Sequence, residues 1–420
     1  TLTITGDGTI DAECGYNNAY GIDVCGGAVV VENGTYTGAL TAIQVTKGSL
    51  TILDGTFKQA DTVSTAAPEY AKYVINCIDG NFADGTARIY VKGGTFCFDP
   101  ADKPEASEIT YVADGYVSVA DGDHYEVIPA VAEADGKYYA TLAEAVAAVK
   151  DGGTVNLLRH ASGAGIGTFE DDPKYGVKDF TIDFNTYTYT CTGPAVGSKG
   201  TESQAFHLEW NGADQPNVNV TLKNGTITAL PSDQSGVVMT IQNYCNLTLD
   251  NMVVDGRDNK SSWPYDYTVS NNCGNVIIRD TTIYAPTTQS GGVAFDSCDY
   301  ATYTGVKVTV EGDSLIVGAI ERTNPNGDED KAKVVITGGR FSEKPDDAYL
   351  KVTGGAFVPD AQGYWTVGSK SGMEAEITTS GDTANVTVGG TFVPDGNGSN
   401  VQNQEDTITI TAGTAGAATS

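Results

Sequence analysis

The chain has 420 residues, enough for two or three domains with a sizeable core, and its formal net charge at pH 7 is −30. This acidic balance argues against nucleic-acid binding, which needs clustered Lys and Arg against phosphates, and it disfavours an anionic membrane surface. The sequence holds no apolar run of about 18 residues and so predicts no membrane span. Abundant Gly, Thr, Val and Tyr predict many short strands joined by turns.

One phrase recurs along the chain. Two apolar residues stand at alternate positions, a Gly follows three residues later, and another apolar residue comes two positions after the Gly. Alternate residues share one face of a strand, Gly permits a bend with positive φ, and the last residue turns inward on the next strand. One such phrase cannot bury its own apolar face, so successive phrases must stack. The phrase occurs at residues 29–36, 50–57, 89–96, 220–227, 334–341 and 350–357.

These stacked phrases predict an all-β fold, a right-handed parallel β-helix in two segments joined by a small α/β connector. Long loops and changes in composition mark the boundaries. The predicted parts are a first β-helix segment (1–100), a connector or small α+β subdomain (101–153), a second segment (154–345), and a strand-rich tail with a C-terminal linker (346–420).

The connector contains the one α-helix that the sequence predicts, near residues 141–150. Thr141 and Glu144 have the spacing of a capping box, and Leu142, Ala145 and Val149 belong to one apolar stripe. A helix directly before a new β-helix segment suits a cap that covers unpaired strand edges at its open end.

Four stretches resemble a known group of proteins: residues 73–77, 92–100, 111–116 and 139–155. They are similar to repeats in large secreted or cell-surface β-helix proteins of gut-associated anaerobic bacteria, and similar phrases occur in fibre-like virion proteins of their phages. The resemblance covers most of residues 29–158. It implies the architecture and a place outside the cell, and no catalytic residue carries over from it.

Five cysteines stand at or just before the predicted coil starts, where they would form a ladder inside the β-helix. Neighbouring coils about 4.8 Å apart suit disulfides between them, and reduced cysteines would equally suit tight buried corners as small apolar residues. Cys14 and Cys25 bracket a Gly- and Asn-rich loop and are the pair that the sequence favours for a disulfide. The predicted ladder comprises Cys25, Cys77, Cys245, Cys273 and Cys298.

Aromatic and polar residues gather on two loops of the second segment. Flat rings on an exposed surface suit stacking against sugars, and nearby Arg or Asp suits sugar hydroxyls or carboxylates; alternatively, Trp210 and Trp263 pack against the side of the strands. The predicted ligand-binding group is His207, Glu209, Trp210, Arg257, Lys260, Trp263, Tyr265 and Tyr267.

An enzyme is the third hypothesis for this chain. A polysaccharide lyase could use Arg257, Lys260 or His207 near a neutralised carboxylate. A glycoside hydrolase would need convergent carboxylates, for which the candidates are Asp250, Asp255, Asp280 and Asp296. The Asn-Thr-Asp and Gly-His-Gly motifs of pectin-degrading β-helix enzymes do not occur, so the sequence predicts no catalytic residue.

The sequence predicts neither a metal site nor a cofactor. It contains only His124, His160 and His207, and its cysteines form no Cys-x-x-Cys pair. The acidic loops 324–330 and 395–400 lack the spacing of known calcium motifs and fit solvated turns.

The function that follows is a non-catalytic, rigid, acidic module outside a bacterial cell, displaying loops for adhesion or glycan contact. The expected partners are a surface glycan or protein, or a further copy of the chain. The alternatives are a fibre or decoration protein of a phage virion and a polysaccharide lyase or glycoside hydrolase.

Overall fold

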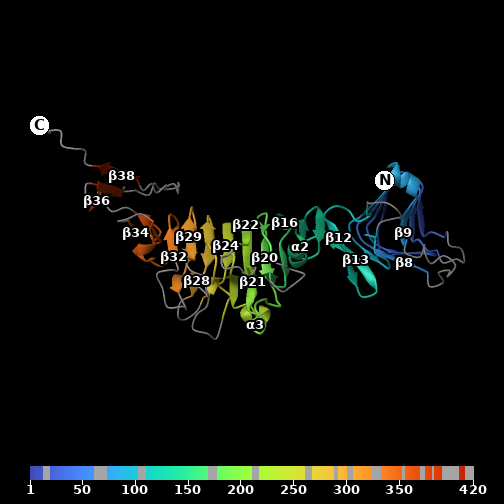
Figure 1. Cartoon of the computed structure of the whole chain (residues 1–420). Coiled ribbons are helices and arrows are strands. Elements are labelled where there is room, and N and C mark those ends of the chain that lie inside the picture. The colour runs from blue at the N-terminus through green and yellow to red at the C-terminus, as the bar shows by residue number, and fades with distance from the viewer. Residues whose placement is uncertain are drawn as a thin grey trace. The chain divides into compact units, whose positions relative to one another are not determined.

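The computed structural model describes residues 1–12, 19–60, 73–102, 110–168, 177–210, 217–260, 267–287, 292–299, 306–323, 333–351 and 355–368, and the backbone of 374–380, 383–389 and 406–411. These residues are mostly β-strand and include extensive parallel sheets, which confirms the predicted all-β class (Figure 1). The chain forms two compact units, Thr1–Glu144 and Ala145–Ser420. None of the helices in these ranges has the length and apolar character needed to cross a membrane.

The first unit contains three parallel sheets that the chain visits in a fixed order. Sheet A is followed by sheet B and then by sheet C, and the cycle repeats up to β11. A short helix, α1 (Asp79–Ala83), follows β9. The parallel strands are β1 (Leu2–Ile4), β4 (Ala28–Val31), β7 (Gly48–Ile52) and β10 (Ala87–Val91) in sheet A; β2 (Thr9–Ala12), β5 (Thr35–Gly38), β8 (Thr56–Gln59) and β11 (Thr95–Phe96) in sheet B; and β3 (Ile22–Val24), β6 (Ile43–Val45) and β9 (Ile75–Cys77) in sheet C.

The repeated phrase places like residues beside one another in this unit. Its closing aromatic residues, Tyr36, Phe57 and Phe96, are cross-strand neighbours in sheet B. Their rings are buried and stacked, with centroids 5.2 Å apart between the first two and 4.8 Å apart between the last two. The preceding glycines adopt positive φ, for example +125° at Gly55, as the turn requires. The phrase therefore builds an aromatic stack in the core.

Antiparallel strands end the first unit. The hairpin of β12 (Tyr116–Asp121) and β13 (His124–Pro129) joins sheet B, because β13 pairs antiparallel with β11. A second hairpin, of β14 (Ala132–Ala134) and β15 (Lys137–Tyr139), follows. These strands lie in the stretch that the sequence predicts as a connector.

Helix α2 (Leu142–Ala148) forms where the sequence predicts a helix. The Thr141 hydroxyl accepts a hydrogen bond from the Glu144 amide, and the Glu144 carboxylate accepts one from the Thr141 amide, both at 3.1 Å, which is a complete capping box. Its apolar stripe is buried. At its other end, the Lys178 ammonium donates to the carbonyls of Ala147 and Val149, which satisfies acceptors that a helix C-terminus leaves open.

The second unit has three rows of parallel strands, two in sheet D and one in sheet E. The first row of sheet D contains β16 (Gly153–Leu157), β19 (Phe180–Asp183), β26 (Val276–Arg279), β29 (Lys307–Glu311) and β32 (Lys333–Ile336); the second contains β17 (Ala161–Gly163), β20 (Thr188–Cys191), β27 (Thr282–Tyr284), β30 (Leu315–Val317) and β33 (Arg340–Phe341). The long strands β22 (Asn219–Ala229) and β24 (Asn246–Asp255) run through both rows. Sheet E contains β18 (Ile166–Thr168), β21 (Gln204–Leu208), β23 (Met239–Asn243), β25 (Tyr267–Asn271), β28 (Val293–Cys298) and β31 (Ala319–Thr323).

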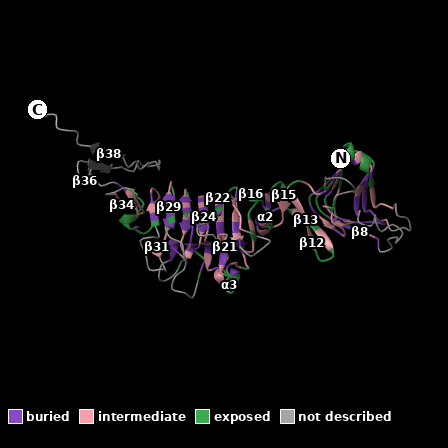
Figure 2. Ribbon diagram, in the orientation of Figure 1, coloured by how far each residue is buried: buried purple, intermediate pink, exposed green. Residues whose placement is uncertain are grey.

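A column of apolar side chains runs through the first row of sheet D. Leu222, Leu249 and Ile278 are direct neighbours on successive strands. Each side chain in the column is fully buried. Figure 2 shows buried residues in purple along β22, β24 and β29. The complete column is Val155, Ile182, Leu222, Leu249, Ile278, Val310 and Ile336.

The strands after residue 350 are antiparallel. β34 (Ala356–Pro359) and β35 (Trp365–Gly368) pair with each other, and β35 also pairs with β33. The backbone of β36 (Glu374–Ser380), β37 (Thr383–Gly389) and β38 (Asp406–Thr411) forms a separate three-stranded sheet. A short helix, α3 (Ser232–Ser235), precedes β23, and a 3-10 turn, η2 (Asp347–Tyr349), precedes β34.

The aromatic stack should contribute strongly to the stability of the first unit. Replacing Phe57, the middle ring, with Ala removes contacts on both sides, and we expect a loss of about 3–5 kcal/mol. Hydrogen exchange of the whole chain should show faster exchange in β5, β8 and β11. Leu53→Ala is the control because that side chain is exposed. Unchanged exchange in Phe57→Ala would contradict the role of the stack.

Candidate functional site

A row of polar side chains crosses sheet E. Register pairs His207 with Gln242, Gln242 with Ser270, and Asp296 with Glu321. Ser270 and Asp296 each follow one member of the aligned pair Val269 and Phe295, so the row is continuous. Cross-strand neighbours in register lie on the same face of a sheet. We call these residues the polar row: His207, Gln242, Ser270, Asp296 and Glu321.

The apolar residue before each member explains why the row is aligned. Phe206, Ile241, Val269 and Phe295 are buried neighbours in sheet E, and they fix the register of their strands. Because side chains alternate along a strand, the next residue takes the other face. His207, Ser270 and Asp296 are nevertheless buried as well, so sheet E is covered on both faces at this position.

Asp296 is the most perturbed group of the row. Burial raises the pKa of its carboxyl group to about 8, and the negative charge of Glu321 acts in the same direction. Hydrogen bonds from the Asn271 amide, at 2.5 Å, and from the Ser270 hydroxyl oppose the rise in pKa without cancelling it. Asp296 is therefore predominantly protonated at neutral pH.

Hydrogen bonds hold both ends of the row. The Tyr267 hydroxyl donates to the Glu321 carboxylate at 2.6 Å. At the other end, Nε2 of His207 lies 3.0 Å from Oε1 of Glu209, whose amide donates to the Thr168 hydroxyl. A neutral carboxylic acid beside a second carboxyl group is an arrangement that can donate and accept protons.

Two buried asparagines make hydrogen bonds in the turns that follow strands β23 and β25 of sheet E. Nδ2 of Asn243 donates to Oδ1 of Asn271 at 2.8 Å and to the carbonyl of Cys245 at 2.6 Å, and Nδ2 of Asn271 donates to the carbonyl of Gly274. Sequence reasoning missed this pair. The signal is the repeated Asn-x-Cys triplet, which ends at Cys245 and again at Cys273.

The predicted cysteine ladder is only partly interior. Cys77, Cys245, Cys273 and Cys298 are buried, whereas Cys25 is exposed, contrary to the expectation, because it follows the end of β3. Burial raises the pKa of Cys77 and of Cys298 to about 11, so both thiols are protonated and unreactive at neutral pH. Cys14, the predicted partner of Cys25, lies outside the described residues.

The first half of the predicted ligand-binding group engages in packing. His207 is buried, and the Trp210 ring lies 5.2 Å from the ring of Tyr244. Trp210 also packs against buried Cys273 and Val306. These contacts agree with the alternative that Trp210 packs against the side of the strands. A role of Trp210 in sugar stacking stays a prediction.

The other described residues of the predicted ligand-binding group, Arg257, Lys260 and Tyr267, lie at the opposite end of the strands of sheet E from His207. Arg257 and Lys260 precede β25, whereas His207 stands near the end of β21, so the parallel strands of sheet E separate the two halves. The Arg257 guanidinium donates two hydrogen bonds to Asp255 and lies 4.5 Å from the ring centre of Tyr284. Tyr267 begins β25. Trp263 and Tyr265 lie outside the described residues, as do loops 324–330 and 395–400.

The aspartates proposed for hydrolysis do not converge. Asp250 lies 3.7 Å from Arg279, Asp255 pairs with Arg257, and Asp280 accepts a hydrogen bond from the amide of Asp313. Of the four candidates only Asp296 belongs to the polar row. Its neighbouring carboxyl group, Glu321, was not among the predicted residues, because nothing in the local sequence marks it.

Comparison of the chain with protein-family models, curated proteins and solved structures found no match.

The raised pKa of Asp296 predicts a specific pH dependence. Between the unfolded pKa, about 4, and the folded value, about 8, the folded state binds more protons, so this group makes stability fall as pH rises, by up to about 1.4 kcal/mol per pH unit. Asp296→Asn should remove that slope. Urea unfolding followed by tryptophan fluorescence reports the second unit, which contains all three tryptophans.

The matched control is Asp233→Asn, because Asp233 is exposed in the first turn of α3. This variant should keep the wild-type pH profile. If the free energy of unfolding changed with pH in the same way for Asp296→Asn and the wild type, Asp296 would be ionised in the folded protein.

Proposed function

We propose that the parallel strands of each unit wind as coils of a right-handed parallel β-helix. Two features support this arrangement: the chain visits the rows of strands in a constant order, and each strand pairs in register with its counterpart in the next cycle. Right-handed connections between parallel strands are the rule. The parallel strands β1 to β11 would then form the first predicted β-helix segment, 1–100, and β16 to β33 the second, 154–345.

The proposed function is that of a rigid, non-catalytic module outside the cell that displays loops for glycan contact. The observation that carries it is the unbroken apolar column from Val155 to Ile336. In such a column each strand is stabilised by its contacts with the neighbouring strands. The loops between the strands can therefore vary without disturbing the core. The strong negative charge of the chain favours solubility and limits self-association.

The described residues 256–260, in the loop before β25, offer the contact surface that best fits a sugar. The Arg257 side chain is 58 % exposed, and its contacts with Asp255 and Tyr284 hold its orientation. Lys260, also exposed, follows three residues later. A fixed guanidinium, an ammonium and an aromatic ring suit the carboxylates and hydroxyls of an acidic polysaccharide.

Binding to a panel of neutral and acidic polysaccharides tests this proposal. The chain should bind a polysaccharide of the panel, an acidic one only through local contacts with Arg257 and Lys260 because the net charge is −30, and should release neither unsaturated nor reducing ends. Arg257→Ala should weaken binding about tenfold to a hundredfold, since it removes charge-assisted hydrogen bonds worth about 1.5–3 kcal/mol. Arg279→Ala is the control: that residue also pairs with carboxylates, but it lies on β26. Equal effects of both variants would point to charge alone, and binding to none of the panel would refute glycan contact.

A second candidate function is polysaccharide cleavage, and the polar row favours it. Protonated Asp296 would serve as general acid, and Glu321, on the neighbouring strand, as base or nucleophile. Product release from any polysaccharide of the panel would support this candidate over the non-catalytic one. In that case Asp296→Asn should abolish release while the chain stays folded.

A further inference from the structure

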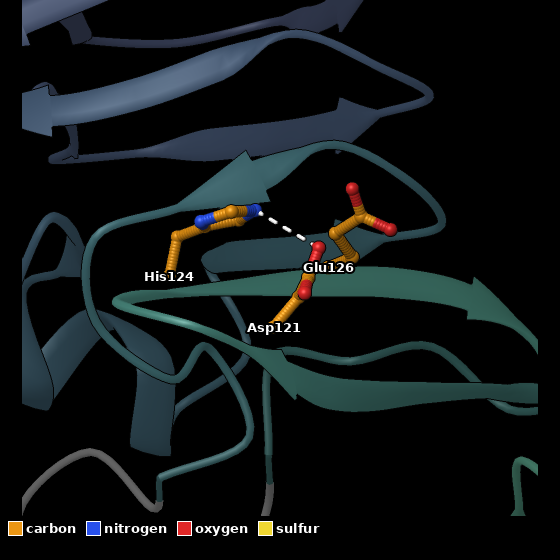
Figure 3. Close-up of side chains that lie close together, drawn as sticks. All are labelled: Asp121, His124 and Glu126. Atoms are coloured by element: carbon orange, nitrogen blue, oxygen red, sulfur yellow. Dashed lines mark ion pairs between the residues drawn. The ribbon is translucent and has the colours of Figure 1, made fainter.

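A cluster of three metal-ligating side chains lies on the β12–β13 hairpin of the first unit. Asp121, His124 and Glu126 each offer a ligand atom, and these atoms all lie within 4.8 Å of one another (Figure 3). Neither the polar row nor the loop before β25 contains any of these residues. The cluster is therefore independent of the proposed function.

The register of the hairpin sets this arrangement. Asp121 and His124 are direct cross-strand neighbours, with a tight turn at Gly122 and Asp123 between them. Gly122 has a φ of +63°, as the first central residue of a two-residue hairpin turn of type II′ requires. Glu126 follows His124 by two residues and so shares its face. The backbone thus places three donors on one side of the hairpin.

The distances fit a small cation. Nε2 of His124 lies 3.5 Å from Oδ2 of Asp121. In a tetrahedral site with ligands at about 2.0–2.1 Å from the metal, neighbouring ligand atoms are about 3.4 Å apart. This pair already has that separation, and a small rotation would bring the Glu126 carboxylate to the same distance.

The second nitrogen of the ring is also engaged. Nδ1 of His124 lies 3.3 Å from Oδ1 of Asp123. A carboxylate on one imidazole nitrogen orients the other toward a metal, as is usual for metal-binding histidines. Among the described residues, the ion pairs of Asp121 and Asp123 are both with His124. A bound cation would offset the negative charges of the two proposed carboxylate ligands, Asp121 and Glu126.

We propose that Asp121, His124 and Glu126 bind a divalent transition-metal cation of the Zn²⁺ class. One imidazole and two carboxylates form a three-ligand set, and water completes the coordination because the side chain of Asp121 is 68 % exposed. The imidazole favours Zn²⁺, Co²⁺ or Ni²⁺ over Mg²⁺ and Ca²⁺, which prefer oxygen ligands. Bound metal would link the two strands of the hairpin beside its turn.

Calorimetric titration of the whole untagged chain with Zn²⁺ tests the site. One equivalent should bind, and His124→Ala and Glu126→Gln should each weaken binding at least about tenfold, because loss of a supporting residue alone costs that much at known sites. Bound Co²⁺ should give the visible absorption of a four- or five-coordinate ion, and this signal should disappear in His124→Ala. Mg²⁺ and Ca²⁺ should bind far more weakly than Zn²⁺.

Two control variants address other sources of binding. Glu32→Gln removes an exposed carboxylate of the same unit and should leave the affinity unchanged. Cys25→Ser removes an exposed thiol and should also have no effect. Loss of Zn²⁺ binding in Cys25→Ser, retention in both cluster variants, or equal affinity for Mg²⁺ would each overturn the proposal.

Discussion

Parallel pairing in register is the constraint on which the rest of this structure depends. It places the residue at a given position of one strand directly beside the corresponding residue of the next. A single apolar position per cycle therefore becomes a continuous core, as from Val155 to Ile336, and a single aromatic position becomes the stack of Tyr36, Phe57 and Phe96. The same rule aligns polar residues and creates the polar row.

Alignment of polar residues has a cost that apolar columns avoid. A buried polar group is destabilising unless it is hydrogen-bonded, and a buried charge more so. The structure meets this cost in two ways. Asn243 donates to the side-chain oxygen of Asn271, and both side chains donate to nearby carbonyls, so these neutral groups are hydrogen-bonded. Asp296 keeps its proton instead, because burial disfavours its charged form and the negative charge of the neighbouring Glu321 acts in the same direction.

Local sequence predicts the parts of the fold that local geometry determines. The phrase ending at Phe57 encodes a strand, a bend at Gly55 and a second strand within eight residues, and the capping box at Thr141 marks a helix start. The class of the fold follows from such signals. The polar row does not, since its members stand 25 to 35 residues apart at irregular intervals, and register alone brings them together. Cys25 shows the same limit, because a position near a coil start does not determine burial.

The two polar clusters differ in ways that determine what each can do. The polar row joins distant residues through parallel strands, is mostly buried, and so changes protonation, as Asp296 shows. The hairpin cluster joins residues only a few positions apart through antiparallel pairing, and its Asp121 carboxylate faces solvent. Burial favours proton chemistry or packing, whereas exposure leaves ligand atoms open to an ion from solution. A short antiparallel hairpin at the end of a parallel sheet is thus the simplest place for this fold to add a binding site.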